Sequence, residues 1–105
     1  MMASGDIYTI DLNKGNVIRI NVDSIILSAC LFYYNTYDKS RWAIVRILNS
    51  SGGWITEIDR GRISKYSEIF KIIYPKIKIN AGEKIYAYND YNYVNAYHRI
   101  TLMEL

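Results

Sequence analysis

The chain has 105 residues, of which 50% are hydrophobic and 22% charged, and its formal net charge is +3. This balance excludes intrinsic disorder, and the length suits one domain, residues 1–105, with a single core. The 13 Lys and Arg residues are spread from Lys14 to Arg99. Because a nucleic-acid-binding surface needs cations gathered on one face, we expect no nucleic-acid partner.

The first residues, Met1 to Asp6, lack the basic and then apolar layout of a signal peptide. No apolar run approaches the ~18 residues of a membrane span. We therefore expect a protein made in the cytoplasm, with no membrane span. Cys30 is the only cysteine, which excludes an intrachain disulfide and a cysteine-based zinc site. It lies in an apolar run, and we predict a buried thiol.

Alternating apolar and polar residues predict half-buried strands over residues 7–12 and 17–22. The turn between them, residues 13–16, has the Gly and Asn residues of tight hairpins. Residues 24–34 form an apolar run that fits a buried helix or a buried strand, and its β-branched and aromatic content favours the strand. A polar loop over 35–40 follows, and we expect it to expose Tyr37.

Residues 41–48 and 54–58 are predicted to form a hairpin across the Asn, Ser and Gly turn at 49–53. Residues 59–67 are polar and predict a loop. The spacing of apolar residues from Ile63 to Tyr74 fits a helix or a strand, and we favour a short strand over 68–74. Pro75 cannot donate to a strand ladder, so we expect it at a sheet edge or a bend.

Residues 76–89 contain two alternating runs separated by a turn, which predicts another hairpin with Gly82 at positive φ. In the second run Tyr86 and Tyr88 share one face and Ile85 and Ala87 the other. Both faces are largely apolar, so we expect a central strand that is covered on both sides. An Asn- and Tyr-rich Ω-loop is predicted over 89–97, and a last strand over 98–105.

About eight short segments joined by Gly, Asn and Ser turns, with little helix, predict an all-β fold. The expected architecture is an antiparallel β-sandwich of the jelly-roll type with two four-stranded sheets.

Catalytic chemistry has little support in this sequence. His98 is the only histidine, and no serine lies in a Gly-x-Ser-x-Gly elbow. The scattered carboxylates are explained as solvated turn residues, and there is no phosphate-binding loop or His and Cys ligand set. We therefore expect no catalytic residue, no metal site and no cofactor, and a protein that is not an enzyme.

Aromatic residues are the better candidates for a site, because they offer flat amphipathic rings to a partner. The alternative is that these rings only pack over the ends of the sandwich. The predicted binding or interface residues are Tyr37, Trp54, Tyr86, Tyr88, Tyr91, Tyr93 and Tyr97.

Residues 79–88, INAGEKIYAY, resemble the penultimate hairpin of two groups of jelly-roll modules. One comprises the trimeric heads of the C1q and tumour-necrosis-factor type, and the other the modules of phage head fibres and tail proteins. The resemblance implies a structural or attachment module, a virion decoration, fibre or tail component, that acts as a homo-oligomer, in some cases a trimer, or joins a larger scaffold. The chain lacks the collagenous or coiled-coil stalk of those heads. The alternative function is carbohydrate binding through tyrosine-rich loops.

Overall fold

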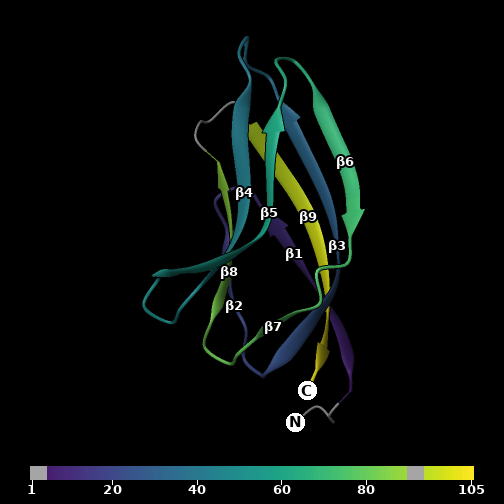
Figure 1. Ribbon diagram of the computed structural model, residues 1–105, viewed down its shortest axis with the longest axis vertical. Helices are drawn as coiled ribbons and strands as arrows, with labels where there is room; N and C mark the ends of the chain where they lie inside the picture. The colour runs from purple at the N-terminus through teal and green to yellow at the C-terminus, as the bar shows by residue number, and fades with distance from the viewer. Residues whose placement is uncertain (1–4, 90–93) are drawn as a thin grey trace.

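The computed structural model describes residues 5–89 and 94–105, and no helix occurs in that part of the chain. Its nine strands form two antiparallel sheets packed face to face (Figure 1). Sheet A has the strand order β1-β9-β3-β6, with the short β7 paired to β3, and sheet B has the order β2-β8-β4-β5. The strands are β1 (Ile7–Asn13), β2 (Val17–Arg19), β3 (Ser24–Asn35), β4 (Arg41–Leu48), β5 (Trp54–Ile63), β6 (Glu68–Ile73), β7 (Ile77–Ile79), β8 (Lys84–Asn89) and β9 (Val94–Glu104).

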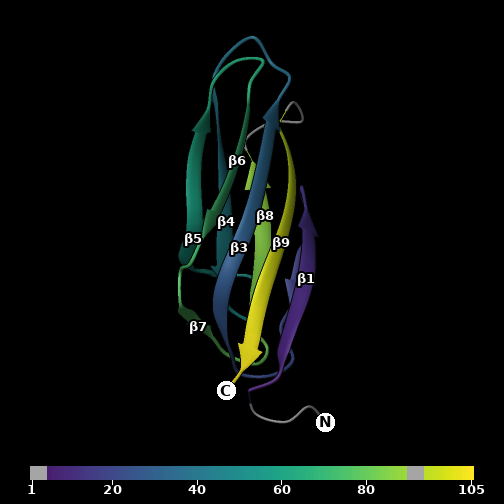
Figure 2. The same cartoon turned by 90° about the vertical axis from the view of Figure 1, so that its right-hand side faces the viewer.

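With β7 set aside, the two sheets have the interleaved strand order of a jelly roll, as predicted. The chain crosses from one sheet to the other after most strands, so β1, β9, β3 and β6 form one layer and β8, β4 and β5 lie behind it (Figure 2). The molecule is elongated, with principal extents of 47 × 27 × 17 Å. Each sheet thus has one face on the core and one long outer face.

The two ambiguous segments are both strands, as the sequence favoured. β3 covers residues 24–35 and β6 covers residues 68–73. Pro75 lies between β6 and β7, which pair with successive parts of β3 at the edge of sheet A, so it occupies the expected sheet edge. Gly82 has the predicted positive φ, 91°. The residues that the structure describes contain no membrane-spanning helix.

Two of the three predicted hairpins are wrong. β4 and β5 pair with each other as expected. The turn at 13–16, however, leads from β1 in sheet A to β2 in sheet B, and the turn at 80–83 leads from β7 in sheet A to β8 in sheet B. Both turns therefore connect the two layers, because each flanking strand finds its partners elsewhere in the chain.

Three strand boundaries also differ from the sequence prediction by more than one residue. β2 ends at Arg19 rather than at residue 22, and β5 continues through the predicted loop to Ile63, because it pairs with β4 as far as Arg41. β9 begins at Val94, so residues 94–97 belong to a strand and not to an Ω-loop. Residues 90–93 of that predicted loop lie outside the described residues.

The core contains the inward residues of both sheets, among them Leu31, Val45, Ile85 and Ile100. A bulge in β3 between Ile26 and Ser28 shifts the alternation by one residue. After it Ala29 and Leu31 point into the core, while Cys30 faces outward and is only half-buried. The prediction of a buried thiol is therefore wrong.

Candidate functional site

The structure divides the predicted site residues between the two outer faces. Tyr86 and Tyr88 lie on the outer face of sheet B, and Trp54 is at the end of the neighbouring hairpin. Tyr97 lies on the opposite side of the molecule, on the outer face of sheet A. Tyr37 is half-buried in the β3–β4 connection with the guanidinium of Arg41 over its ring. The remaining two, Tyr91 and Tyr93, lie outside the described residues.

The outer face of sheet A carries a row of three aromatic side chains, which we call the aromatic ladder: Phe70, Phe32 and Tyr97. Phe32 on β3 pairs with Phe70 on β6 and with Tyr97 on β9, so the rings lie side by side across three strands. The ring centroids of Phe32 and Tyr97 are 6.4 Å apart. Phe70 is 65% exposed and Tyr97 57%, so two of the three rings are open to solvent.

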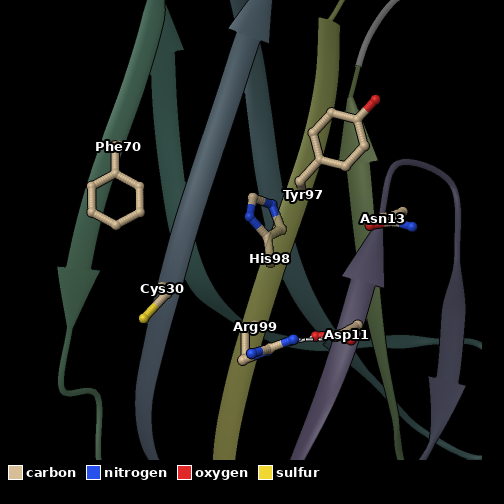
Figure 3. Close-up of a pocket in the computed structure, with 7 residues that line it drawn as sticks. All are labelled: Asp11, Asn13, Cys30, Phe70, Tyr97, His98 and Arg99. Carbon is tan, nitrogen blue, oxygen red and sulfur yellow. Dashed lines mark hydrogen bonds and ion pairs between the residues drawn. The ribbon is translucent and has the colours of Figure 1, made fainter.

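Beside the aromatic ladder lies a second row, in which Cys30 pairs with Ile72 on one side and with Arg99 on the other. Arg99 donates from Nε to Oδ1 of Asp11 at 2.9 Å, which pairs the two charges. These rows border a shallow depression of about 490 Å³, with Phe70 and Tyr97 on either side of β3 (Figure 3). The depression is thus lined by the rings of Phe70 and Tyr97 together with the Asp11–Arg99 ion pair, whose two charges cancel.

The outer face of sheet B has a different chemistry. Ala43, Val45 and Ile47 of β4 point into the core, so the alternate residues face outward. Cross-strand pairing places the outward residues of β2, β4, β5 and β8 next to one another. We call this surface the arginine–aromatic face. Its charged and aromatic residues are Arg19, Trp42, Arg46, Trp54, Glu57, Arg60, Arg62, Lys84, Tyr86 and Tyr88, and the aliphatic Val17, Ile44 and Leu48 lie among them.

Arg46 lies at the centre of the arginine–aromatic face between two rings. Its guanidinium carbon is 4.5 Å from the ring centroid of Trp54 and 4.3 Å from that of Tyr88. Tyr88 in turn meets Tyr86 edge to face, with centroids 6.1 Å apart. The buried Nε of Arg46 has no hydrogen-bond partner in the described part of the chain. The planar cation thus stacks between two rings, and its charge also acts on the neighbouring Glu57 carboxylate, whose pKa it helps to lower.

At the other end of this face, Arg60 and Arg62 lie over the ring of Trp42, at 5.5 and 5.9 Å from its centroid. Arg60 also forms an ion pair with Glu57, and its Nε donates to both carboxylate oxygens. The pKa of Glu57 is lowered, chiefly by the hydrogen bonds from Arg60, against a smaller opposing effect of burial. Glu57 therefore stays ionised and paired with Arg60.

A polar bridge crosses the interior between the two sheets. The hydroxyl of Tyr33 on β3 donates to Oδ2 of Asp59 on β5 at 2.7 Å, and Nζ of Lys71 on β6 is 2.9 Å from Oδ1. Burial, and then the hydrogen bond to the Asp59 carboxylate, raise the pKa of Tyr33. Tyr33 is therefore a neutral hydrogen-bond donor and not a base.

His98 is buried beside this bridge, with its ring between β3 and β9 (Figure 3). Its Nδ1 accepts a hydrogen bond from the backbone N–H of Phe32 at 3.2 Å, and its ring meets that of Tyr33 edge to face. Burial lowers the pKa of His98 to about 4, although the nearby Asp59 carboxylate acts in the opposite direction. The imidazole is neutral near pH 7 and bonds to the backbone, not to a nucleophile.

The described residues contain no group of three or more His, Cys, Asp or Glu side chains placed to hold a metal ion.

Sequence reasoning missed several residues of the two faces as site residues: Phe32, Phe70 and Ile72 on sheet A, and Trp42 and Arg46 on sheet B. Period two alone could have assigned Phe70 and Ile72 to a common face, but the neighbours of Arg46 depend on strand pairing.

No family model matches the chain, and comparison with curated proteins gives no match. Function is therefore inferred from the side chains of the two outer faces.

Proposed function

We propose that the protein is a non-enzymatic structural or attachment module that assembles with copies of itself, or with a larger scaffold, through the outer face of sheet A. The observation that carries this proposal is the exposure of the aromatic ladder, with Phe70 and Tyr97 open to solvent beside a 48% exposed Ile72. Contiguous exposed apolar surface on a soluble protein is typical of an interaction site.

The dimensions of this face suit a protein partner. Four strands about 4.8 Å apart and up to about 35 Å long give a face of roughly 700 Å², close to the ~800 Å² per partner of a standard interface. The ion pair of Arg99 with Asp11 lies within this face and cancels their two charges, so two copies can approach there without repulsion. Tyr97 also offers a hydroxyl that can hydrogen-bond at the rim of such an interface.

A place in a virion, as a phage decoration, fibre or tail component, is part of the same proposal. It depends on the resemblance of residues 79–88 to phage head-fibre and tail modules, and the jelly-roll strand order supports it at the level of fold. If the same face packs against itself in two copies, the assembly is a two-fold dimer, whereas a trimer would pair this face with a different surface of the next copy.

The test is sedimentation velocity of the purified protein at tens of micromolar. We expect an oligomer for the wild-type chain and a monomer for the double variant Phe70→Thr and Tyr97→Thr, which removes the exposed rings but keeps strand-favouring residues. Tyr66→Asn is the matched control. Tyr66 is 69% exposed in the β5–β6 turn at φ 50°, where asparagine is tolerated.

A wild-type monomer contradicts self-assembly, and a double variant that assembles like the wild type contradicts assembly through the outer face of sheet A. A wild-type monomer that binds a glycan array in a tyrosine-dependent manner would favour the alternative, carbohydrate binding.

A further inference from the structure

The arginine–aromatic face carries more cationic than anionic side chains. Its cations are Arg19, Arg46, Arg60, Arg62 and Lys84, and Glu57 is the one carboxylate among the described outward strand positions of sheet B. That carboxylate is neutralised by its ion pair with Arg60. The remaining positive charge suits a polyanionic partner.

Aromatic rings lie among these cations and are themselves accessible. Trp54 is 56% exposed and Trp42 38%, and each carries a stacked guanidinium, from Arg46 and from Arg60 and Arg62. Rings and guanidinium planes are the surfaces on which unpaired bases stack, while arginine forks bind phosphate oxygens. Rings that can stack bases and arginines that can bind phosphates are thus interspersed on the outer face of sheet B.

We propose that the arginine–aromatic face binds single-stranded nucleic acid without strong sequence preference. A flat sheet can stack splayed bases on its rings, whereas the bases of a duplex are already stacked and cannot reach Trp42 or Trp54. A neutral sugar gains nothing from the net positive charge of this face, and the Glu57 carboxylate that could accept from its hydroxyls is engaged by Arg60. Charge and ring exposure together favour the single strand.

The length of the face is compatible with such a ligand. Trp42 pairs with Arg62 at one end of β4, and Leu48 pairs with Trp54 at the other. Six residues of strand span about 20 Å, long enough for an extended run of a few nucleotides. The sequence analysis expected no nucleic-acid partner because the Lys and Arg residues are spread along the chain. Strand pairing brings five of them together on one face, so we replace that expectation with this proposal.

The test is fluorescence anisotropy with a labelled oligothymidylate of about twelve nucleotides, at low and at physiological salt, with far-ultraviolet circular dichroism of every variant as a check of the fold. We expect Trp54→Ala to weaken binding at least ~5-fold, and Trp54→Phe to retain most of the affinity, because stacking is the main contribution. Arg62→Gln should weaken binding and reduce the salt slope by about 0.7 for each lost phosphate contact.

Matched controls come from the opposite face. Arg99→Gln removes the same charge, and Phe70→Thr removes an exposed ring of sheet A, and both should stay within ~2-fold of the wild type. Because these controls lie on the proposed assembly face, loss of self-association and loss of nucleic-acid binding are distinguished by different variants.

Three results would overturn the inference: no binding of the oligothymidylate at tens of micromolar, equal affinity for a duplex of the same length, or affinity that does not depend on Trp54. Heparin that binds tighter than the oligothymidylate, with no effect of Trp54→Ala, would assign the face to an acidic polysaccharide.

Discussion

The hydroxyl of Tyr33 and the carboxylate of Asp59, 2.7 Å apart, join the inner faces of the two sheets. The Asp59 side chain is only 11% exposed and also pairs with Lys71. A charge in this position is stable only while its hydrogen-bond partners remain, because an unsatisfied buried carboxylate has lost its hydration without replacement.

Replacing Tyr33 by Phe should therefore destabilise the fold. Tyr33→Phe removes the donor and leaves the ring, so we expect the free energy of unfolding to fall by about 1–3 kcal/mol. Urea denaturation followed by circular dichroism measures it. Tyr34→Phe is the control, since Tyr34 is the next residue on β3, faces outward and is exposed. Equal stability of the two variants would show that the bridge contributes nothing.

The burial of His98 predicts that stability depends on pH. Its pKa falls from the ordinary 6.5 to about 4 in the folded protein, so between these values the unfolded chain binds more protons than the folded one. Stability is then complete above pH ~6.5 and decreases as the pH falls toward ~4, by up to about 3 kcal/mol. Urea midpoints measured from pH 7 to pH 4 should follow this curve.

His98→Asn separates this effect from that of the carboxylates. The asparagine oxygen can still accept the hydrogen bond from Phe32 N–H but does not titrate. The variant should have a flatter dependence on pH between 6.5 and 4. A curve parallel to that of the wild type would assign the pH dependence to other groups.

Gly82 lies in the turn that carries the chain from sheet A to sheet B, at φ 91°. A Cβ in this conformation is strained, so Gly82→Val should lower the free energy of unfolding by more than ~1 kcal/mol. Gly82→Asn should cost less, because asparagine tolerates left-handed φ. Thermal melting of both variants gives the comparison, and similar losses would be inconsistent with a backbone origin.

The half-buried position of Cys30 predicts that a thiol reagent labels it in the folded protein. Cys30 lies beside the aromatic ladder, between Ile72 and Arg99. If sheet A packs against another copy, labelling should slow as the protein concentration rises above the assembly range. Labelling only after unfolding, at any concentration, would contradict the outward orientation of Cys30.

Local patterns identified the strands well but not their partners. The alternation in residues 76–89 correctly indicates β7 and β8, yet the turn at Gly82 has the same Asn and Gly chemistry whether it joins paired strands or crosses between sheets. The partner is decided by distant residues, since Ile77 pairs with Ile26 and Tyr86 pairs with Arg46. Pairing between strands that are far apart in the chain cannot be predicted from a short stretch of sequence.

The errors at individual side chains have equally specific causes. A single bulge after Ile26 reverses the direction of every later residue of β3, which moves Cys30 from the predicted core to the surface. Tyr86 and Tyr88 were expected under a second layer, but their face is the outside of sheet B, covered partly by Arg46 and by each other. Apolar rings on a strand do not by themselves distinguish a buried face from a binding face.

Both tryptophans of the chain, Trp42 and Trp54, lie on the arginine–aromatic face, and sheet A has none. Intrinsic fluorescence excited at tryptophan wavelengths therefore samples one side of the molecule and neither the core nor the aromatic ladder. Quenching or an emission shift on adding a ligand would locate the event at sheet B without any label. Self-association through sheet A should leave the same emission unchanged, so one spectrum can tell the two kinds of binding apart.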